Sequence, residues 1–288
     1  MAARRVSQSE VQAGAERLGL AGLPVCLHAS LRSFPALEDG PATLVDGLLA
    51  CGATVMVATM ANESFGVPAP ADDRPGRNGI DYAAEDRRTG EVSRPGQRDR
   101  YDPSRTEVDR VLGATPAYVA ARPDRVRCRL PTGTFSAVGP LAASLIQAEV
   151  AADTFGPLRE LVLRSGWVLL AGVGLNRMTL LHLAEVEAGR RAFVRWALGP
   201  DGRPTRSVGG GCSEGFEHLA VPLASVEFRV RVGESLWRAY PAAETVALAA
   251  GAIVEDPSIT RCGDPGCLEC RDAIAGGPIE RPSPRAAG

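Results

Sequence analysis

Three side chains that could carry proton-transfer chemistry stand at successive steps of three in the chain: Thr179, His182 and Glu185. A helix over this segment would place all three on one face. Histidine loses its proton nearest neutral pH, and a carboxylate one helical turn away can fix its tautomer and stabilise the imidazolium. The spacing is therefore typical of a general base. The alternative interpretation is a histidine on a helix surface that is paired with a glutamate by chance.

The segment before this predicted helix indicates that the helix follows a strand of a sheet. Residues 167–174 read Trp-Val-Leu-Leu-Ala-Gly-Val-Gly, an apolar run that ends in glycines. Such a run predicts a buried strand followed by a tight turn. The histidine would then lie at the carboxyl end of a strand, where α/β proteins usually bind their ligands.

A second group of reactive side chains lies near the end of the chain, where Cys262, Cys267 and Cys270 are separated by glycine, proline and acidic residues. Zinc sites favour thiolates that are close in sequence on tight turns, with a further ligand from elsewhere. Cys212 or a histidine such as His218 could supply that fourth ligand. The sequence thus predicts a structural zinc site, with reduced thiols near a surface turn as the alternative.

The elements that would position these residues begin with a helix over 7–18, in which Ser7 and Glu10 form a capping-box pattern. Apolar runs at 23–28 and 53–58 predict two buried strands, and the segment 40–51 between them predicts a helix. A strand, a helix and a second strand in this order indicate an α/β fold with a parallel core.

The rest of the chain continues as a mixture of helices and strands. Helices are predicted at 105–121, with an interruption near Gly113 and Pro116, near 140–151 and at 244–251. Strands are predicted at 126–130, 191–198 and 225–232, with a turn at 200–203 that could begin a hairpin and a loop at 209–216 that leads to a helix.

One long segment, 68–102, is crowded with proline, glycine, arginine and aspartate and shows no hydrophobic periodicity. We expect a surface loop there, either one that covers a pocket or a mobile insertion. The segment 276–288 is rich in proline and glycine and is expected to be a loose tail. Residues 1–275 would then form one large domain.

Composition limits the classes of function. The 288 residues carry a formal net charge of −2, so neither a nucleic-acid nor a membrane partner is indicated. The chain has no lysine, which excludes a lysine nucleophile or Schiff base. The N-terminus lacks the apolar core of a signal peptide, and no apolar run is long enough to span a bilayer. We expect a cytoplasmic protein, monomeric or homodimeric, whose cysteines are reduced or bind metal.

Five segments, in family order, together resemble the aminoglycoside 3-N-acetyltransferase family, the antibiotic N-acetyltransferases that are unrelated to the GNAT fold. The matching segments are His-Ala-Ser-Leu-Arg-Ser-Phe at 28–34, Tyr-Asp-Pro-Ser-Arg-Thr at 101–106, Pro-Thr-Gly-Thr-Phe-Ser-Ala-Val-Gly at 131–139, the stretch 169–185, and Gly-Cys-Ser-Glu-Gly-Phe at 211–216. The resemblance covers the chain from about residue 25 to about residue 275.

The resemblance implies a three-layer fold, in which a mixed sheet carries helices on both faces. It also implies direct acetyl transfer from acetyl-CoA to an amine, without a covalent enzyme intermediate. His182 would remove the proton from the attacking ammonium, and Glu185 would orient His182 and favour its protonated form. Thr179 would donate a hydrogen bond to the developing oxyanion, or else act as an N-cap at the helix start.

The resemblance also places the CoA pyrophosphate at the turn that follows the first strand. A strand-to-helix turn offers backbone N–H groups and hydroxyls to an anion, although serines in such a turn can equally satisfy the backbone. The residues implied in cofactor binding are His28, Ser30, Leu31, Arg32 and Ser33.

The acceptor is less closely defined. The family usually has a histidine at the position of Leu130, and Ala29 replaces a serine. Asp102, Glu107 and Asp109 are acidic residues that could hold a polycationic aminoglycoside. The alternatives are an acyltransferase of the same fold that acts on another amine, and a catalytically silent relative that binds CoA or another ligand.

Overall fold

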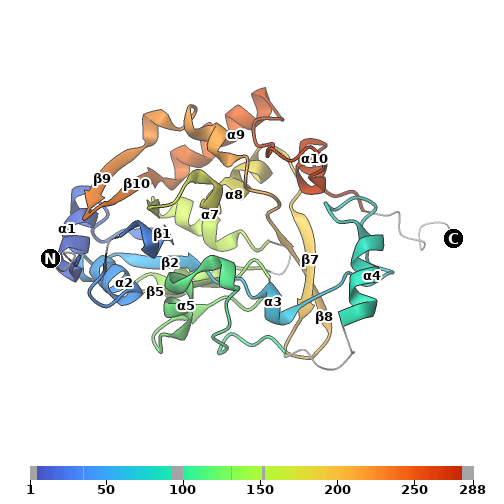
Figure 1. The fold of residues 1–288 in the computed structure, drawn as a ribbon, viewed down its shortest axis with the longest axis horizontal. Coiled ribbons are helices and arrows are strands. Elements are labelled where there is room, and N and C mark those ends of the chain that lie inside the picture. The colour runs from blue at the N-terminus through green and yellow to red at the C-terminus, as the bar shows by residue number, and fades with distance from the viewer. Residues whose placement is uncertain (1–4, 35, 93–99, 131, 151–152, 281–288) are drawn as a thin grey trace.

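The computed structural model describes residues 5–34, 36–92, 100–130, 132–150 and 153–280. Its centre is a seven-stranded sheet (Figure 1), in which β1 pairs in parallel with β2 and with β6 while the other neighbours are antiparallel. The predicted parallel core is therefore confirmed, within a mixed sheet. The strands in spatial order are β4 (Val126–Arg127), β5 (Phe135–Val138), β2 (Thr54–Ala58), β1 (Pro24–Ala29), β6 (Trp167–Ala171), β10 (Ser235–Pro241) and β9 (Phe228–Val232).

Helices cover both faces of this sheet. One face carries α1 (Gln8–Arg17), α2 (Pro41–Ala50) and α5 (Ala114–Ala121). The other carries α6 (Ala142–Gln147), α7 (Gly156–Leu163), α8 (Leu180–Glu187) and α9 (Ala242–Glu255). The three-layer architecture is thus confirmed. No helix among the described residues has the length and apolar character needed to cross a membrane.

The central strands read as continuous apolar runs because successive side chains enter two different cores. In β1, Val25 and Leu27 lie in the core beneath α1 and α2, whereas Cys26 lies in the core beneath α7 to α9. In β6, Leu169 and Leu170 divide between the two cores in the same way. Since each of these side chains is buried, β1 and β6 are held rigidly, and with them the turns at their carboxyl ends.

A smaller sheet stands beside the main one and consists of β3 (Gly66–Val67), β7 (Phe193–Leu198) and β8 (Pro204–Gly209). β7 and β8 form the hairpin that the turn signal at 200–203 predicts. Figure 1 shows this hairpin with α4 (Tyr82–Val92) and α10 (Leu268–Ile274) at the end of the molecule opposite α1. A short helix, α3 (Asn62–Phe65), leads into β3.

The described part of the segment 68–102 is not all loop, so that expectation is wrong for α4. The helix starts where the Asp81 carboxylate accepts the backbone N–H of Ala84 at 3.0 Å. It is fixed by an ion pair of 2.5 Å between Arg74 and Asp86, and Tyr82 packs against the small sheet. Among the α4 residues whose side chains are described, 82–87, Tyr82 is the large apolar one, which agrees with the lack of hydrophobic periodicity in the segment.

Other elements differ from the predictions in their bounds. Residues 105–109 are not helical, because they bind neighbouring segments instead, as when the Asp109 N–H donates to the Met60 carbonyl at 2.7 Å. The tail is not loose over 276–280, since the Ile279 N–H donates to the Arg77 carbonyl at 3.0 Å. Residues 281–288 lie outside the described residues. Short 3-10 turns occur at Leu31–Ser33, Arg110–Leu112, Leu175–Arg177, Phe216–Ala220 and Ala224–Val226.

Candidate active site

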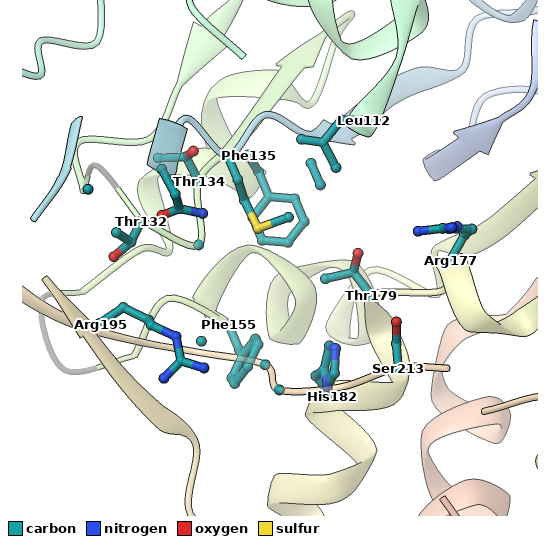
Figure 2. A pocket seen from close by; sticks show the side chains of 18 of the residues that line it. Leu112, Thr132, Thr134, Phe135, Phe155, Arg177, Thr179, His182, Arg195 and Ser213 are labelled. Carbon is teal, nitrogen blue, oxygen red and sulfur yellow. The ribbon is translucent and has the colours of Figure 1, made fainter. Parts of the chain in front are cut away.

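A cavity of about 440 Å³ opens between the main sheet and the small sheet. Its walls come from the ends of β2 and β5, from the turn that leads into α8, from β3 and β7, and from the glycines that follow β8. Figure 2 shows His182 and Thr179 on one wall and Phe135 and Leu112 opposite them. The volume lies in the range of small-molecule binding sites.

His182 and Glu185 form the pair that their spacing predicts. Nδ1 of His182 lies 2.8 Å from a carboxylate oxygen of Glu185, and both side chains are about nine-tenths buried. A carboxylate accepts hydrogen bonds, so Nδ1 carries the proton and Nε2 is the nitrogen that remains for a ligand. His182 lines the cavity and both residues are buried, so the pair does not lie on an exposed helix surface.

Glu185 has a second partner, Arg190, that sequence reasoning missed. Arg190 donates to the other carboxylate oxygen at 2.6 Å and also to the Thr260 hydroxyl and the Pro257 carbonyl. This arginine lies just beyond the end of α8, so helical spacing does not reveal it. Arg190 neutralises part of the charge of Glu185, and the carboxylate therefore mainly orients the imidazole.

Two further contacts fix the imidazole of His182. The ring of Phe216 packs against it with the ring centres 4.9 Å apart. On another side the backbone of Gly210 comes so close that a Cβ there would lie 2.2 Å from Cδ2 of the ring. Only glycine permits this approach without displacement, so the loop after β8 restricts the orientation of the ring.

Thr179 stands at the N-cap position of α8, but its side chain makes no capping hydrogen bond. It lines the cavity, and Figure 2 shows its hydroxyl directed away from His182, toward the opposite wall. The position agrees with the N-cap interpretation, whereas the side chain is placed to meet a ligand.

The turn at 30–33 lies next to the turn that follows β6 and not in the cavity wall. The Ser30 N–H donates to the Ala171 carbonyl at 3.0 Å, and Ser33 shares a hydrogen bond of 2.7 Å with Ser235. Gly172 has a φ of 71°, and a Cβ there would lie 2.0 Å from the Ser33 hydroxyl. The two turns are therefore locked together, which places residues 30–33 beside the chain that leads to α8.

The remaining predicted cofactor residues have different surroundings. Arg32 is exposed and forms no ion pair with any residue in the described ranges. Leu31 packs against the core beneath α1 and α2. His28 is partly buried, with Nε2 at 3.6 Å from the Cys26 sulfur, and its removal from solvent lowers the pKa of His28 to about 4. At neutral pH His28 is uncharged, so it cannot offer a positive charge to a phosphate.

The lowered pKa of His28 predicts an acid-sensitive stability. Unfolded, His28 binds a proton near its ordinary pKa of 6.5, whereas in the folded chain it binds one only near 4. Between these values the unfolded state holds more protons, so the free energy of unfolding falls as the pH is lowered through this window. His28→Gln should flatten this part of the curve and leave stability above pH 6.5 unaffected by the lost titration. Urea unfolding of both proteins across the window measures it, and parallel curves would contradict the assignment.

The predicted acceptor-binding acids do not line the cavity. Asp102 is exposed and accepts the Ser104 N–H, and Glu107 pairs with Arg105 at 2.5 Å. Asp109 is buried and accepts the backbone N–H of residue 63 at 2.8 Å. All three carboxylates form hydrogen bonds or an ion pair with neighbouring protein groups. None of the three is among the residues that line the cavity.

The charged residues that do line the cavity are Glu85 from α4 and two arginines, Arg177 and Arg195. Arg195 is paired with Glu269 at 2.5 Å. Thr132 contributes a buried hydroxyl that has no hydrogen-bond partner among the described residues. Sequence reasoning missed these residues because they come from separate segments, with no local spacing that relates them.

The four candidate metal ligands lie together. The sulfur atoms of Cys212, Cys262, Cys267 and Cys270 are all within 4.8 Å of one another and could hold a metal ion. His218, the other candidate for the fourth ligand, instead places Nδ1 at 3.0 Å from the Ile259 carbonyl.

Comparison with known proteins identifies similar sequences. The model of the aminoglycoside 3-N-acetyltransferase family matches residues 26–252. Aminoglycoside N(3)-acetyltransferase VIII of Streptomyces fradiae is 32% identical over 187 residues, which cover 63% of this chain and 62% of that protein. Aminoglycoside N(3)-acetyltransferase IX of Micromonospora chalcea is 29% identical over 191 residues, which cover 65% of this chain and 64% of that protein. The chain thus matches less than two thirds of the length of these relatives.

Solved structures match this chain over a larger fraction of its length. The apoenzyme of aminoglycoside acetyltransferase AAC(3)-IVa has a TM-score of 0.72 and 26% identity, with 95% of this chain and 98% of that chain covered. A histidine-to-alanine mutant of that enzyme, solved in complex with a gentamicin, has a TM-score of 0.71 and 25% identity. The match covers 96% of this chain and 99% of that chain. Because the family model spans more than half of the sequence, this chain belongs to the aminoglycoside 3-N-acetyltransferase family.

Proposed function

We propose that this protein transfers the acetyl group of acetyl-CoA directly to an amine, with His182 as the general base, and that the acceptor is the 3-amino group of an aminoglycoside. The observation that carries the proposal is the buried pair of His182 and Glu185 at the wall of the cavity. Membership in the family supports the choice of reaction. The protein would act in the cytoplasm, where acetyl-CoA is supplied, as a monomer or homodimer.

The chemistry requires a base because an ammonium has no lone pair to attack with. Nε2 of His182 takes one proton from the acceptor nitrogen, which then attacks the thioester carbonyl carbon. A C–N bond forms and the C–S bond breaks. The nitrogen loses two protons in all: one ends on the CoA sulfur and the other passes through His182 to solvent. Glu185 holds Nδ1, so that the lone pair of Nε2 stays directed at the cavity.

We assign the supporting roles from position. Thr179 would donate its hydroxyl to the oxyanion that forms at the thioester carbonyl, since it stands one turn before His182. The turn at 30–33 would meet the CoA pyrophosphate mainly through Arg32, because the N–H groups of Ser30 and Ser33 already donate to backbone carbonyls. Its contact with the turn after β6 supports this role, because the two turns would lie at the same end of one elongated ligand.

Glu85 is the carboxylate that faces the cavity from α4, and we propose that it binds an ammonium group of the acceptor. Thr132 would add a hydrogen bond through its buried hydroxyl. Asp102, Glu107 and Asp109 would act from outside the cavity, by attracting a cationic acceptor at longer range.

A second candidate acceptor follows from the charge of the walls. Arg177 and Arg195 both line the cavity, and Arg177 is half exposed with its nearest acid, Glu214, 3.9 Å away. Glu269 offsets the charge of Arg195, but the charge of Arg177 at the cavity wall does not favour a polycation. An amine that also carries a negative group would suit this cavity, with the same fold and the same base.

Acetylation of a panel of amines tests the proposal and separates the two acceptors. With acetyl-CoA, the panel would contain gentamicin, apramycin and amino acids as amines with a negative group. We expect one acetyl group to be added to an aminoglycoside, as measured by mass spectrometry. Acetylation of the anionic amines alone would select the second candidate. If no amine is acetylated while CoA still binds, the protein is a silent relative and the proposed function is wrong.

A further inference from the structure

The four-cysteine cluster is built like a metal site. The sulfur atoms of Cys212, Cys262, Cys267 and Cys270 lie within 4.8 Å of one another. In a tetrahedral zinc site with four thiolates the sulfurs are about 3.8 Å apart, because each Zn–S bond is about 2.3 Å long. A small contraction of this cluster reaches that geometry. Four thiolates are also the ligand set that selects zinc over magnesium or calcium.

The fold orients these sulfurs before any metal binds. Cys267 is the N-cap of α10, and its sulfur accepts the backbone N–H of Cys270 at 3.5 Å. The sulfur of Cys270 in turn accepts the N–H of Cys262 at 3.4 Å. Amide groups that point at sulfur stabilise a thiolate and fix its direction, as the outer contacts of metal ligands do.

Cys212 comes from a distant part of the chain, and this makes the cluster relevant to the cavity. It follows Gly210 and Gly211 in the loop after β8. Gly210 touches the imidazole of His182, and Gly211 packs against the ring of Phe193. A ligand bound to Cys212 would therefore also fix the backbone of Gly210, which restricts the ring of His182.

The other side of the cluster also reaches the cavity wall. Glu269 lies between Cys267 and Cys270 on α10 and forms the ion pair with Arg195. One metal ion would consequently fix two wall segments, the glycine loop and the position of Arg195. Without a metal, the loop at 209–213 is joined to its surroundings by weaker contacts, such as the hydrogen bond of 2.8 Å from Ser213 to the Asn176 carbonyl.

We propose that Cys212, Cys262, Cys267 and Cys270 bind one zinc ion, and that this ion is a positioning element that holds the loop 209–213 against His182. The ion takes no part in acetyl transfer, because its four ligand positions are all filled by protein thiolates. Zinc also anchors the C-terminal segment to the small sheet, so it contributes to folding stability.

Metal analysis tests the first half of the proposal. Protein purified without chelator should contain about one zinc ion per chain, and Cys212→Ser should lose most of it. Cys51→Ser is the matched control, since Cys51 is half-buried outside the cluster with its thiol donating to the Leu48 carbonyl. Zinc below half an equivalent in the wild type, iron in its place, a disulfide within the cluster, or full zinc in Cys212→Ser would each overturn the assignment.

Hydrogen exchange tests the second half and needs no substrate. In Cys212→Ser, and in wild-type protein stripped with a chelator, amides 209–213 should exchange about tenfold faster, while those of β1 stay protected. Circular dichroism checks that the variant is folded, and the chelated wild type repeats the comparison without any substitution. Loss of zinc with unchanged exchange at 209–213 would refute the positioning role. Because neither readout depends on acetylation, failure here is separate from failure of the proposed function.

Discussion

His182→Ala should lower the turnover number for acetyl transfer by roughly 10²–10⁴-fold, which is the usual contribution of a general base. Acetyl-CoA affinity should stay close to that of the wild type, because the turn assigned to CoA lies beside the cavity and not against the imidazole. The variant should fold, since Glu185 keeps its ion pair with Arg190 when the histidine is gone. Steady-state kinetics and calorimetric titration with CoA measure the two effects.

His218→Ala is the matched control for this experiment. His218 is exposed, lies outside the cavity and bonds a backbone carbonyl at 3.0 Å. Its replacement should leave turnover unchanged. A wild-type rate in His182→Ala would remove the role of His182 as the base, and equal losses in both histidine variants would indicate a general structural effect.

Glu185→Gln should reduce both turnover and stability. The amide oxygen can still accept the hydrogen bond from Nδ1 of His182, but it carries no charge to stabilise the imidazolium that forms during the reaction, so the rate falls. Arg190, which is 7% exposed, is left buried without an anion. Removing one partner of a buried ion pair typically destabilises a protein by about 3–5 kcal/mol, so the free energy of unfolding should fall by about this amount.

The double variant Glu185→Gln with Arg190→Met separates the two effects. Removing both charges eliminates the unpaired arginine, so much of the lost stability should return. The rate should not return, because the carboxylate is still missing. Denaturant unfolding and steady-state kinetics of the three proteins provide the measurements. An unchanged rate in Glu185→Gln would remove its orienting role, and a double variant as unstable as the single one would contradict the account of the buried charges.

Local spacing made part of this site predictable. The steps of three from Thr179 to Glu185 predict one helical face, and the structure has Nδ1 of His182 at 2.8 Å from the Glu185 carboxylate. The capping box of Ser7 and Glu10 is present for the same reason, because its partners are three residues apart. Strands β1 and β2 could be recognised because both faces of the sheet are covered and their residues are continuously apolar.

The rest of the site depends on contacts between segments that are distant in sequence. Arg190 binds Glu185 from beyond the end of α8 and donates to the Thr260 hydroxyl and the Pro257 carbonyl. No short sequence motif predicts these contacts. Glu85 lies on α4, whose described side chains, those of residues 82–87, include one large apolar residue, Tyr82. The sequence offered Cys212, or else a histidine such as His218, as the fourth metal ligand, and only the packing of the loop after β8 against α10 distinguishes them.

The most direct test of the central claim is a crystal structure of the protein with CoA and an acceptor amine such as gentamicin bound together. We expect the nitrogen to be acetylated to lie within hydrogen-bond reach of Nε2 of His182, with the CoA sulfur near Thr179. An acceptor nitrogen bound away from His182, or an imidazole turned so that Nε2 faces the protein interior in the complex, would contradict it.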